Sequence, residues 1–210
     1  MIRYFVRTTA ERKLDKSYSQ IDYNLLIDTE HKPIESFIHQ LKYLSTVCTD
    51  VVLIEDDLIL CEEFTNKIEN AIKQYPDKII NFFCNYDTYF KTRESNEYSS
   101  NCCTYYPKRI LSILADTMPK YIKYSTQYSW IENLALQELK ETHIQYRPCL
   151  VQHLDFDTLI QKGNHKLRRT LYFIDYLKEL DISYEDASTP ENQQKLKELM
   201  ESKFQNYNGT

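Results

Sequence analysis

Residues 51 to 57 read Val-Val-Leu-Ile-Glu-Asp-Asp, so four large apolar side chains run directly into three carboxylates. A short apolar run of this kind is typical of a strand buried in a core. The carboxylates cannot be buried without partners, because removing an ionised group from water is very costly. The pattern therefore predicts a core strand whose carboxyl end reaches the edge of an α/β sheet, where such sheets bind their ligands. Three neighbouring anions also repel one another unless a cation joins them, and a hard divalent metal ion is the simplest candidate.

Apolar strands and amphipathic helices alternate through the first 85 residues, which predicts a parallel, doubly wound α/β sheet. Strands are expected at 2–6, 23–27, 51–54 and 79–84, with helices at 33–44 and 64–75. Proline 33 suits the first turn of a helix. Later elements are expected as a strand at 102–106, helices at 107–118 and 130–141, a last strand at 144–151, and a helix beginning near Pro190. The polar, tyrosine-rich residues 85–101 between them are expected to form an active-site loop.

The chain has only two glycines, Gly163 and Gly209, against an average usage of about 7%. A GxGxxG dinucleotide loop and a P-loop both need glycines that this chain lacks, so both are excluded. A nucleotidyltransferase also uses metal-binding carboxylates on a related sheet, but it normally has a glycine-rich loop after the first strand. Here Arg7, Thr8 and Thr9 occupy that position, which disfavours this class.

The charge and the cysteines of the chain limit its expected partners and its expected location in the cell. The formal net charge of -5 and the pI near 5.6 give no overall attraction to nucleic acid or to an anionic membrane. The N-terminus reads as a strand rather than a signal peptide, and no apolar run is long enough to span a bilayer. None of the six cysteines forms a CxxC pair, so zinc is not expected. Free thiols favour a cytoplasmic location, with Cys102 and Cys103 buried rather than reactive.

Three segments together resemble the GT-A-fold glycosyltransferases, over roughly residues 2–160. An apolar strand ending in Glu55-Asp56-Asp57 resembles the DxD-type motif of that fold. The segment 147–153, Arg-Pro-Cys-Leu-Val-Gln-His, is similar to a Pro-Ser-Leu-Val-Gln-His segment of several such families. The segment 103–107, Cys-Thr-Tyr-Tyr-Pro, looks like the part that shapes the acceptor pocket. The resemblance implies a GT-A catalytic domain at 1–160, a Rossmann-like, mostly parallel sheet flanked by helices. It leaves 161–210 as a basic loop and a helical C-terminal extension packed on that domain.

The resemblance also implies an activity and a metal. Enzymes of this type move a sugar from a nucleotide-diphospho donor, here expected to be UDP-linked, to a glycan or another hydroxyl acceptor. Mn²⁺ or Mg²⁺ stabilises the leaving diphosphate as a Lewis acid. Asp57 and His153 are the implied metal ligands, and Glu55 and Asp56 would contact ribose, donor sugar or metal-bound water. The alternative for the triplet is a solvated cluster of acids that caps a helix N-terminus.

Further site residues follow from the same resemblance. The nucleotide is expected at the ends of the first two strands, at Arg7, Thr8, Thr9 and Asp28. Ordinary polar loops would carry the same residue types. An inverting transferase needs a carboxylate to deprotonate the acceptor hydroxyl, and Glu132 lies where many members carry an acid at a helix start. The neighbour is Asn133, where the family usually has an acidic residue, so the stereochemistry stays open.

The basic stretch 162–169 is a candidate lid over the diphosphate, since arginine binds phosphate through two hydrogen bonds. Arg168 and Arg169 are the expected lid residues, and a solvated charged loop is the alternative. Two other functions also stay open. One is a non-catalytic or degenerate protein that binds sugar nucleotides or carbohydrate. The other is transfer to modified bases in DNA, which the acidity of the chain disfavours although residues 162–169 would meet phosphates.

Overall fold

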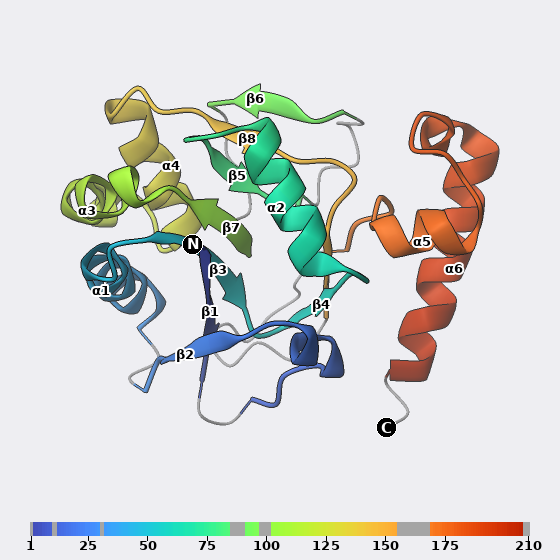
Figure 1. Cartoon of the computed structure of the whole chain (residues 1–210), viewed down its shortest axis with the longest axis horizontal. Coiled ribbons are helices and arrows are strands. Elements are labelled where there is room, and N and C mark those ends of the chain that lie inside the picture. Colours follow the sequence, from blue (N-terminus) through green and yellow to red (C-terminus); the bar gives the residue numbers. More distant parts are fainter. Residues whose placement is uncertain are drawn as a thin grey trace.

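A mixed α/β sheet forms the centre of the computed structural model, which describes residues 2–9, 12–29, 32–84, 91–96, 102–154 and 169–207 (Figure 1). Within these residues the sheet has seven strands in the order β2-β1-β3-β7-β5-β8-β6. Its strands are β1 (Ile2–Thr8), β2 (Tyr23–Ile27), β3 (Asp50–Glu55), β5 (Ile79–Asn81), β6 (Arg93–Ser95), β7 (Cys103–Tyr106) and β8 (His143–Gln145). Neighbours β2, β1 and β3 are parallel, as are β5 and β8, whereas β7 and the edge strand β6 run antiparallel to their neighbours. The expected α/β class with a mostly parallel sheet is therefore confirmed.

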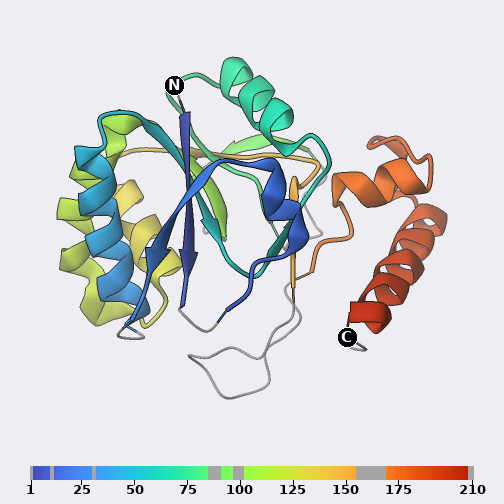
Figure 2. The ribbon, with the colours of Figure 1, turned by 60° about the horizontal axis from the view of Figure 1, so that its bottom comes forward.

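Helices cover both faces of this sheet, because its central strands are apolar on both sides. In β3, Val51 and Leu53 pack on one face, whereas Val52 and Ile54 pack on the other. Figure 2 shows the helices that cover the first face gathered on one side of the sheet. They are α1 (Pro33–Thr46), α3 (Lys108–Thr117) and α4 (Tyr128–Glu138), with the 3₁₀ segment η2 (Met118–Tyr124). The other face carries α2 (Phe64–Gln74) and the 3₁₀ segment η1 (Lys16–Gln20).

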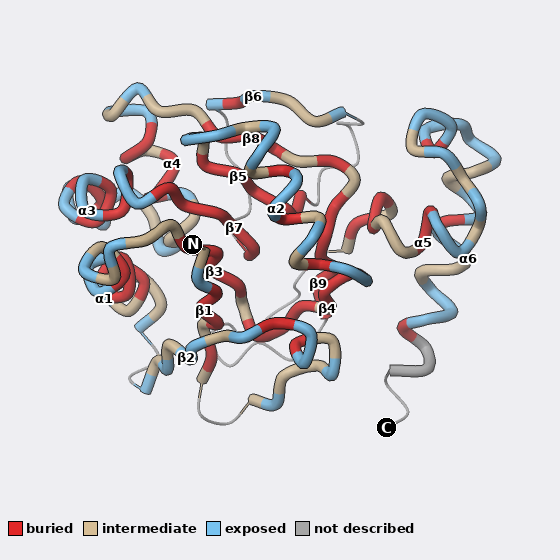
Figure 3. The backbone as a smooth tube through the Cα atoms, viewed as in Figure 1, coloured by how far each residue is buried: buried red, intermediate tan, exposed pale blue. Residues whose placement is uncertain are grey.

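The helices of the first half follow the apolar spacing of the sequence. Pro33 occupies the first turn of α1, and Phe37, Leu41 and Leu44 are buried along one side of that helix. In α2, Phe64, Ile68 and Ala71 are buried in the same way. Figure 3 shows the result, with buried residues concentrated in the central strands and in the helix sides that face them.

The expected strand at 144–151 is wrong, because this segment contributes to two different sheets. Its start forms β8, and its end begins β9 (Val151–His153), which pairs antiparallel with β4 (Leu58–Leu60). Between them lies Pro148, which has no backbone N–H to donate to a strand ladder. The short strands β4 and β6 were also not expected, since three-residue elements carry too little periodicity to be recognised.

The C-terminal segment packs beside β4 and β9. It contains α5 (Ile174–Glu179), the 3₁₀ segment η3 (Asp186–Ser188) and α6 (Pro190–Tyr207). Cys149 joins it to the sheet, donating its N–H to Tyr172 and accepting from the N–H of Ile174. Thr189 Oγ1 accepts the N–H of Asn192 at 3.4 Å, which caps the N-terminus of α6, the helix expected to begin near Pro190. Among the described residues, no helix has the length and apolar character required to cross a bilayer.

Candidate active site

The three carboxylates lie at the carboxyl end of β3, in the centre of the sheet. Glu55 is the last residue of β3, and Asp56 and Asp57 form the turn into β4. Both aspartates are buried, with 5% and 8% of their surfaces exposed. The N–H of Glu55 donates to the carbonyl of Cys102 at 2.7 Å, which extends the pairing of β3 with β7 by one step. Polar groups buried this deeply need partners. Arg12 is shared by the two aspartates, Asp57 also faces His153, and Glu55 lies beside Arg7.

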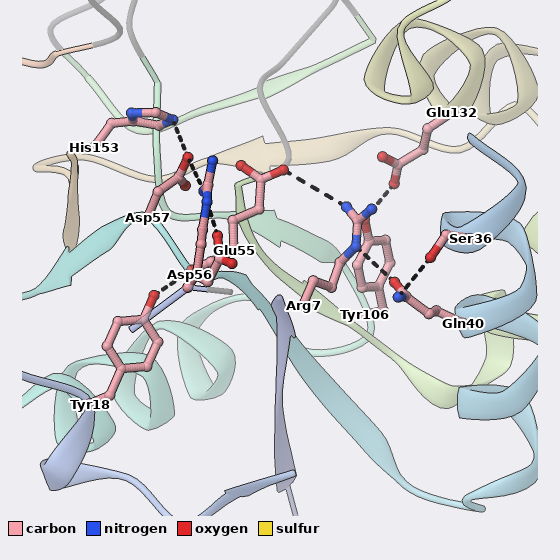
Figure 4. Close-up of polar contacts among 11 residues, drawn as sticks. Arg7, Tyr18, Ser36, Gln40, Glu55, Asp56, Asp57, Tyr106, Glu132 and His153 are labelled. Atoms are coloured by element: carbon pink, nitrogen blue, oxygen red, sulfur yellow. Dashed lines mark hydrogen bonds and ion pairs between the residues drawn. The ribbon is translucent and has the colours of Figure 1, made fainter. Parts of the chain in front are cut away.

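His153 is brought to Asp57 by the small sheet. In the pairing of β4 with β9, Leu58 lies opposite His153, and the N–H of Leu154 donates to the carbonyl of Asp57 at 2.7 Å. His153 Nε2 consequently lies 3.5 Å from Asp57 Oδ2, and Figure 4 shows the two side chains pointing toward each other. The structure thus places together the two residues that the resemblance pairs as metal ligands.

Arg12 neutralises two of the three acids. Its Nη1 lies 2.7 Å from Asp56 Oδ1 and 3.1 Å from Asp57 Oδ2. Burial would lower the pKa of Arg12, but the charges of Asp57 and Asp56 outweigh it and the pKa rises. The N–H of Thr9 also donates to Asp56 Oδ2 at 3.3 Å. Sequence reasoning missed Arg12, and its place shortly after the first strand was the available signal, because β1 and β3 are parallel and end at one edge.

Arg7 approaches the site from β1, where its backbone pairs with Glu55 of β3. Its guanidinium packs against the adjoining rings of Phe37 and Tyr128, whose centroids are 4.9 Å apart, with the carbon of the group 4.7 and 4.5 Å from the two centroids. Nε donates to Gln40 Oε1 at 2.8 Å, and Nη1 lies 3.8 Å from Glu55 Oε1. This cage fixes the orientation of Arg7 and places a permanent positive charge beside Glu55.

The Glu55 carboxylate lies among several charged and polar groups. Burial, followed by the charge of Asp57, raises its pKa. The charges of Arg7 and His153 and a hydrogen bond from the Cys102 thiol oppose that rise. The Glu55 carbonyl accepts a hydrogen bond from the hydroxyl of Tyr18, whose pKa is raised mainly by burial. The Glu55 carboxylate is therefore surrounded by the guanidinium of Arg7, the thiol of Cys102 and the imidazole of His153.

Glu132 lies apart from the triplet. It is buried in α4, with 5% of its surface exposed, and accepts a hydrogen bond of 2.7 Å from the Tyr106 hydroxyl. Burial and the nearby Glu132 charge raise the pKa of Tyr106. In Figure 4, Glu132 lies on the far side of Arg7 from Asp57 and His153. A cavity of about 20 Å³, large enough for one water molecule, adjoins it and is lined by Asn81, Thr104, Ser129, Asn133 and His143, among others.

The remaining predicted residues are more scattered. Asp28 follows β2 beside the end of β1, and its N–H donates to the Thr8 carbonyl at 2.9 Å. Thr8 and Thr9 follow one another at that same edge. Arg169 places its guanidinium 3.7 Å from the centroid of the Phe204 ring on α6. Arg168 lies outside the described residues, as do 155–167 and most of the tyrosine-rich segment at 85–101.

Two overlapping sets of described side chains are suited to a metal ion. Asp57 and His153 offer a carboxylate and an imidazole, and Oδ1 of Asp57 is buried with no hydrogen-bond partner among the described residues. Glu55, Cys102 and His153 offer one ligand atom each, all within 4.8 Å of one another. Cys102 was expected to be buried and inert, and it is buried.

No protein-family model and no curated protein matches this sequence. Among solved structures, the chain is similar to the crystal structure of A197 from STIV. The similarity covers 78% of this chain and 100% of that chain, with 10% sequence identity and a TM-score of 0.49. A likeness this distant carries no information about what the present chain binds or does.

Proposed function

We propose that this chain is a metal-dependent glycosyltransferase with the GT-A arrangement of strands. It would transfer a sugar from a nucleotide-diphospho donor, expected to be a UDP-sugar, to a hydroxyl acceptor. The observation that carries the proposal is the approach of His153 Nε2 to within 3.5 Å of Asp57 Oδ2 at the carboxyl end of β3. Open α/β sheets bind ligands at this edge, and the site combines three carboxylates with one imidazole there.

The donor set supports Mn²⁺ or Mg²⁺. Both ions favour carboxylate oxygens, and an imidazole is compatible with Mn²⁺. Asp57 Oδ1 has lone pairs that no described residue uses, and the buried oxygen would gain a partner from an ion. Asp57 and His153 would hold the ion. It would supply Lewis-acid stabilisation of the negative charge on the departing diphosphate.

The protein's own side chains account for the remaining roles. Arg7 is fixed beside Glu55 and Arg12 beside Asp56, so both carboxylates are held in place to accept hydrogen bonds from ribose or sugar hydroxyls. Thr8, Thr9 and Asp28 lie at the ends of β1 and β2, the expected nucleotide position. Glu132 would take the proton from the acceptor hydroxyl, for which its contact with Tyr106 must give way to the acceptor.

The decisive experiment measures release of nucleoside diphosphate from a panel of nucleotide-diphospho sugars, in the presence of Mn²⁺ and mixed hydroxyl acceptors. The wild-type chain is expected to release product from at least one donor, and a chelator is expected to abolish release. Asp57→Ala should lose both release and Mn²⁺-dependent nucleotide binding. Asp116→Asn, an exposed acid on α3, should leave both unchanged.

The outcomes separate the proposal from its alternatives. Mn²⁺-dependent binding of a donor without release of nucleoside diphosphate would identify a non-catalytic binding protein instead. Release that persists in Asp57→Ala at the wild-type rate would contradict the assigned metal site. Release that needs DNA as the acceptor would support the glycosylation of modified bases.

A further inference from the structure

A second set of metal-binding side chains adjoins Asp57. Glu55, Cys102 and His153 present a carboxylate oxygen, a thiol sulfur and an imidazole nitrogen, all within 4.8 Å of one another. Cys102 and His153 are buried, with 1% and 6% of their surfaces exposed. The family resemblance assigns no role to Cys102, so this set needs an explanation of its own.

Backbone hydrogen bonds hold the three residues in place. Glu55 and Cys102 are cross-strand neighbours, because the Glu55 N–H donates to the Cys102 carbonyl at 2.7 Å just beyond the paired residues Ile54 and Cys103. His153 is fixed independently, by the pairing of β9 with β4 opposite Leu58. Glu55 and His153 lie on strands and Cys102 directly precedes β7, and ligands held by regular elements are positioned more precisely than ligands on loops, which favours binding.

His153 has unused binding capacity. Its Nδ1 is buried and has no hydrogen-bond partner among the described residues, and such an atom loses the free energy of a water contact without replacement. The Cys102 thiol already donates a hydrogen bond to the Glu55 carboxylate, so sulfur and oxygen are neighbours before any ion arrives. An ion between the three groups would satisfy the imidazole and replace the thiol proton.

The local charges also favour a divalent cation. Among the described residues at the site, three carboxylates (Glu55, Asp56 and Asp57) face two guanidinium groups (Arg7 and Arg12), which leaves one negative charge. Ionised Cys102 would add a second. A divalent ion would therefore bring the cluster to neutrality, which lowers the electrostatic cost of burying it.

The donor set selects a particular kind of ion. Thiolate and imidazole are preferred by Zn²⁺, at about 2.3 Å for sulfur and about 2.0–2.1 Å for nitrogen, and a carboxylate oxygen completes three ligands with a fourth position open. Divalent zinc also binds such sites more tightly than manganese does. Spacing in the sequence gave no sign of this set, because its members come from three separate elements rather than from a CxxC pair.

We propose that Glu55, Cys102 and His153 form a thiophilic metal site that binds Zn²⁺. On binding, the Cys102 thiol gives its proton to the solvent and a sulfur–zinc bond forms. His153 is also, with Asp57, a ligand of the proposed Mn²⁺ or Mg²⁺ site. Zinc bound to His153 therefore makes the imidazole unavailable to that ion. Zinc is therefore an inhibitor of the chain, a consequence that rests on the proposed glycosyltransferase function, whereas zinc binding itself does not.

Co²⁺ serves as a spectroscopic substitute for zinc in the test, because a thiolate bound to Co²⁺ gives a charge-transfer absorption band. The wild-type chain and Cys48→Ser are expected to show this band at one ion per chain and to lose it when Zn²⁺ is added. Cys48 is the exposed thiol, so its removal controls for nonspecific binding of the metal to a surface cysteine. Cys102→Ser should lose the band, and its zinc affinity should fall by more than the roughly 10–100-fold that an outer-sphere substitution costs. Zinc affinity is measured by competition with a chromogenic chelator.

Failure of this site is distinguishable from failure of the proposed function. Asp57→Asn should keep the cobalt band and lose less zinc affinity than Cys102→Ser, because it removes a nearby charge but no zinc ligand, while it loses Mn²⁺-dependent nucleotide binding. In turnover assays, micromolar zinc should inhibit the wild-type chain and leave Cys102→Ser active with Mn²⁺. The zinc site is overturned if the wild-type chain shows no cobalt band, or if the band disappears in Cys48→Ser. Neither outcome depends on whether a Cys102 variant folds. A chain that binds zinc but has no transferase activity keeps the zinc site and discards only the inhibitory role.

Discussion

His153 Nε2 lies 3.5 Å from Asp57 Oδ2, although the two residues are far apart in the sequence. The contact depends on backbone pairing, since Leu58 of β4 lies opposite His153 of β9 and the N–H of Leu154 donates to the Asp57 carbonyl. The imidazole is therefore held against the carboxylate before any ligand binds. A site preorganised in this way does not have to order its ligands when an ion arrives, which favours affinity.

Replacement of His153 by alanine should weaken Mn²⁺ binding in the presence of a nucleoside diphosphate by more than about tenfold, because one protein ligand of the ion is lost. The affinity can be measured from the electron paramagnetic resonance signal of free Mn²⁺. His39→Ala provides the control, because His39 is exposed on α1. Equal affinities for His153→Ala and the wild-type chain would remove His153 from the metal site.

Arg12→Ala should lower the free energy of unfolding by up to about 3 kcal/mol, because Asp56 and Asp57 lose a shared, mostly buried cation. Added Mn²⁺ should then restore more stability to Arg12→Ala than it adds to the wild-type chain, since the ion replaces the missing charge. Urea denaturation with and without Mn²⁺ measures both effects.

The matched control for Arg12 is Arg109→Ala. Arg109 forms a pair of 2.6 Å with Glu141, but its side chain is 44% exposed. An exposed pair contributes only about 0–1 kcal/mol, and Mn²⁺ should not restore its loss. A similar loss of stability in both variants, unaffected by Mn²⁺, would show that Arg12 has no special relation to a cation site.

The parts of the fold that sequence predicted well have strong periodicity. The helix α1 was expected from Pro33 and from apolar spacing, and β3 from a run of large apolar residues ending in acids. The order of strands was not predictable, because β7 enters antiparallel between β3 and β5 and only long-range pairing decides that placement. The division of the segment 144–151 into β8 and β9 was missed for the same reason.

The candidate site shows a similar division. Asp57 and His153 were expected together from the family resemblance, and strand ends made the placement of Arg7 at the same edge foreseeable. Arg12 was missed because it lies in a polar segment with no motif, and its role depends on a contact with residues more than 40 positions later. Cys102 was missed because its neighbours in space are supplied by other elements.

Glu132→Gln should lower the rate of sugar transfer by at least about 100-fold, because the amide cannot accept the acceptor's proton. Binding of the nucleotide-diphospho donor should be unchanged, which calorimetry can measure. Glu138→Gln, an exposed change on the same helix, should leave the rate intact. Unchanged turnover in Glu132→Gln would instead mean that Glu132 serves only to hold Tyr106, with which it shares a hydrogen bond of 2.7 Å.

Leu196→Ala should lower the free energy of unfolding by about 2–5 kcal/mol, because a fully buried leucine of α6 would leave a cavity. Leu196 belongs to the same apolar cluster as Leu60 and Val151 of the small sheet, so its loss should also weaken Mn²⁺ binding at His153. Lys197→Ala, an exposed neighbour, should change neither quantity. Loss of stability without any loss of Mn²⁺ affinity would separate the C-terminal segment from the site.

His143 should make the stability of the chain depend on pH. It is buried on β8, which lies between β5 and β6, and burial, with the charge of Arg93, lowers its pKa from 6.5 to about 4. Between those values the unfolded chain binds a proton that the folded chain does not, so the free energy of unfolding falls as the pH drops from 6.5 toward 4.

The expected loss from His143 between pH 7 and pH 5 is about 2 kcal/mol. Urea denaturation at both pH values measures it, and the contribution of His143 is the difference between the wild-type chain and His143→Gln, which carries no titrating group there. His39→Gln, an exposed substitution, should retain the full pH dependence. A pH dependence that is identical in His143→Gln and the wild-type chain would mean that the pKa of His143 is the same in the folded and the unfolded chain, which contradicts its lowering by burial.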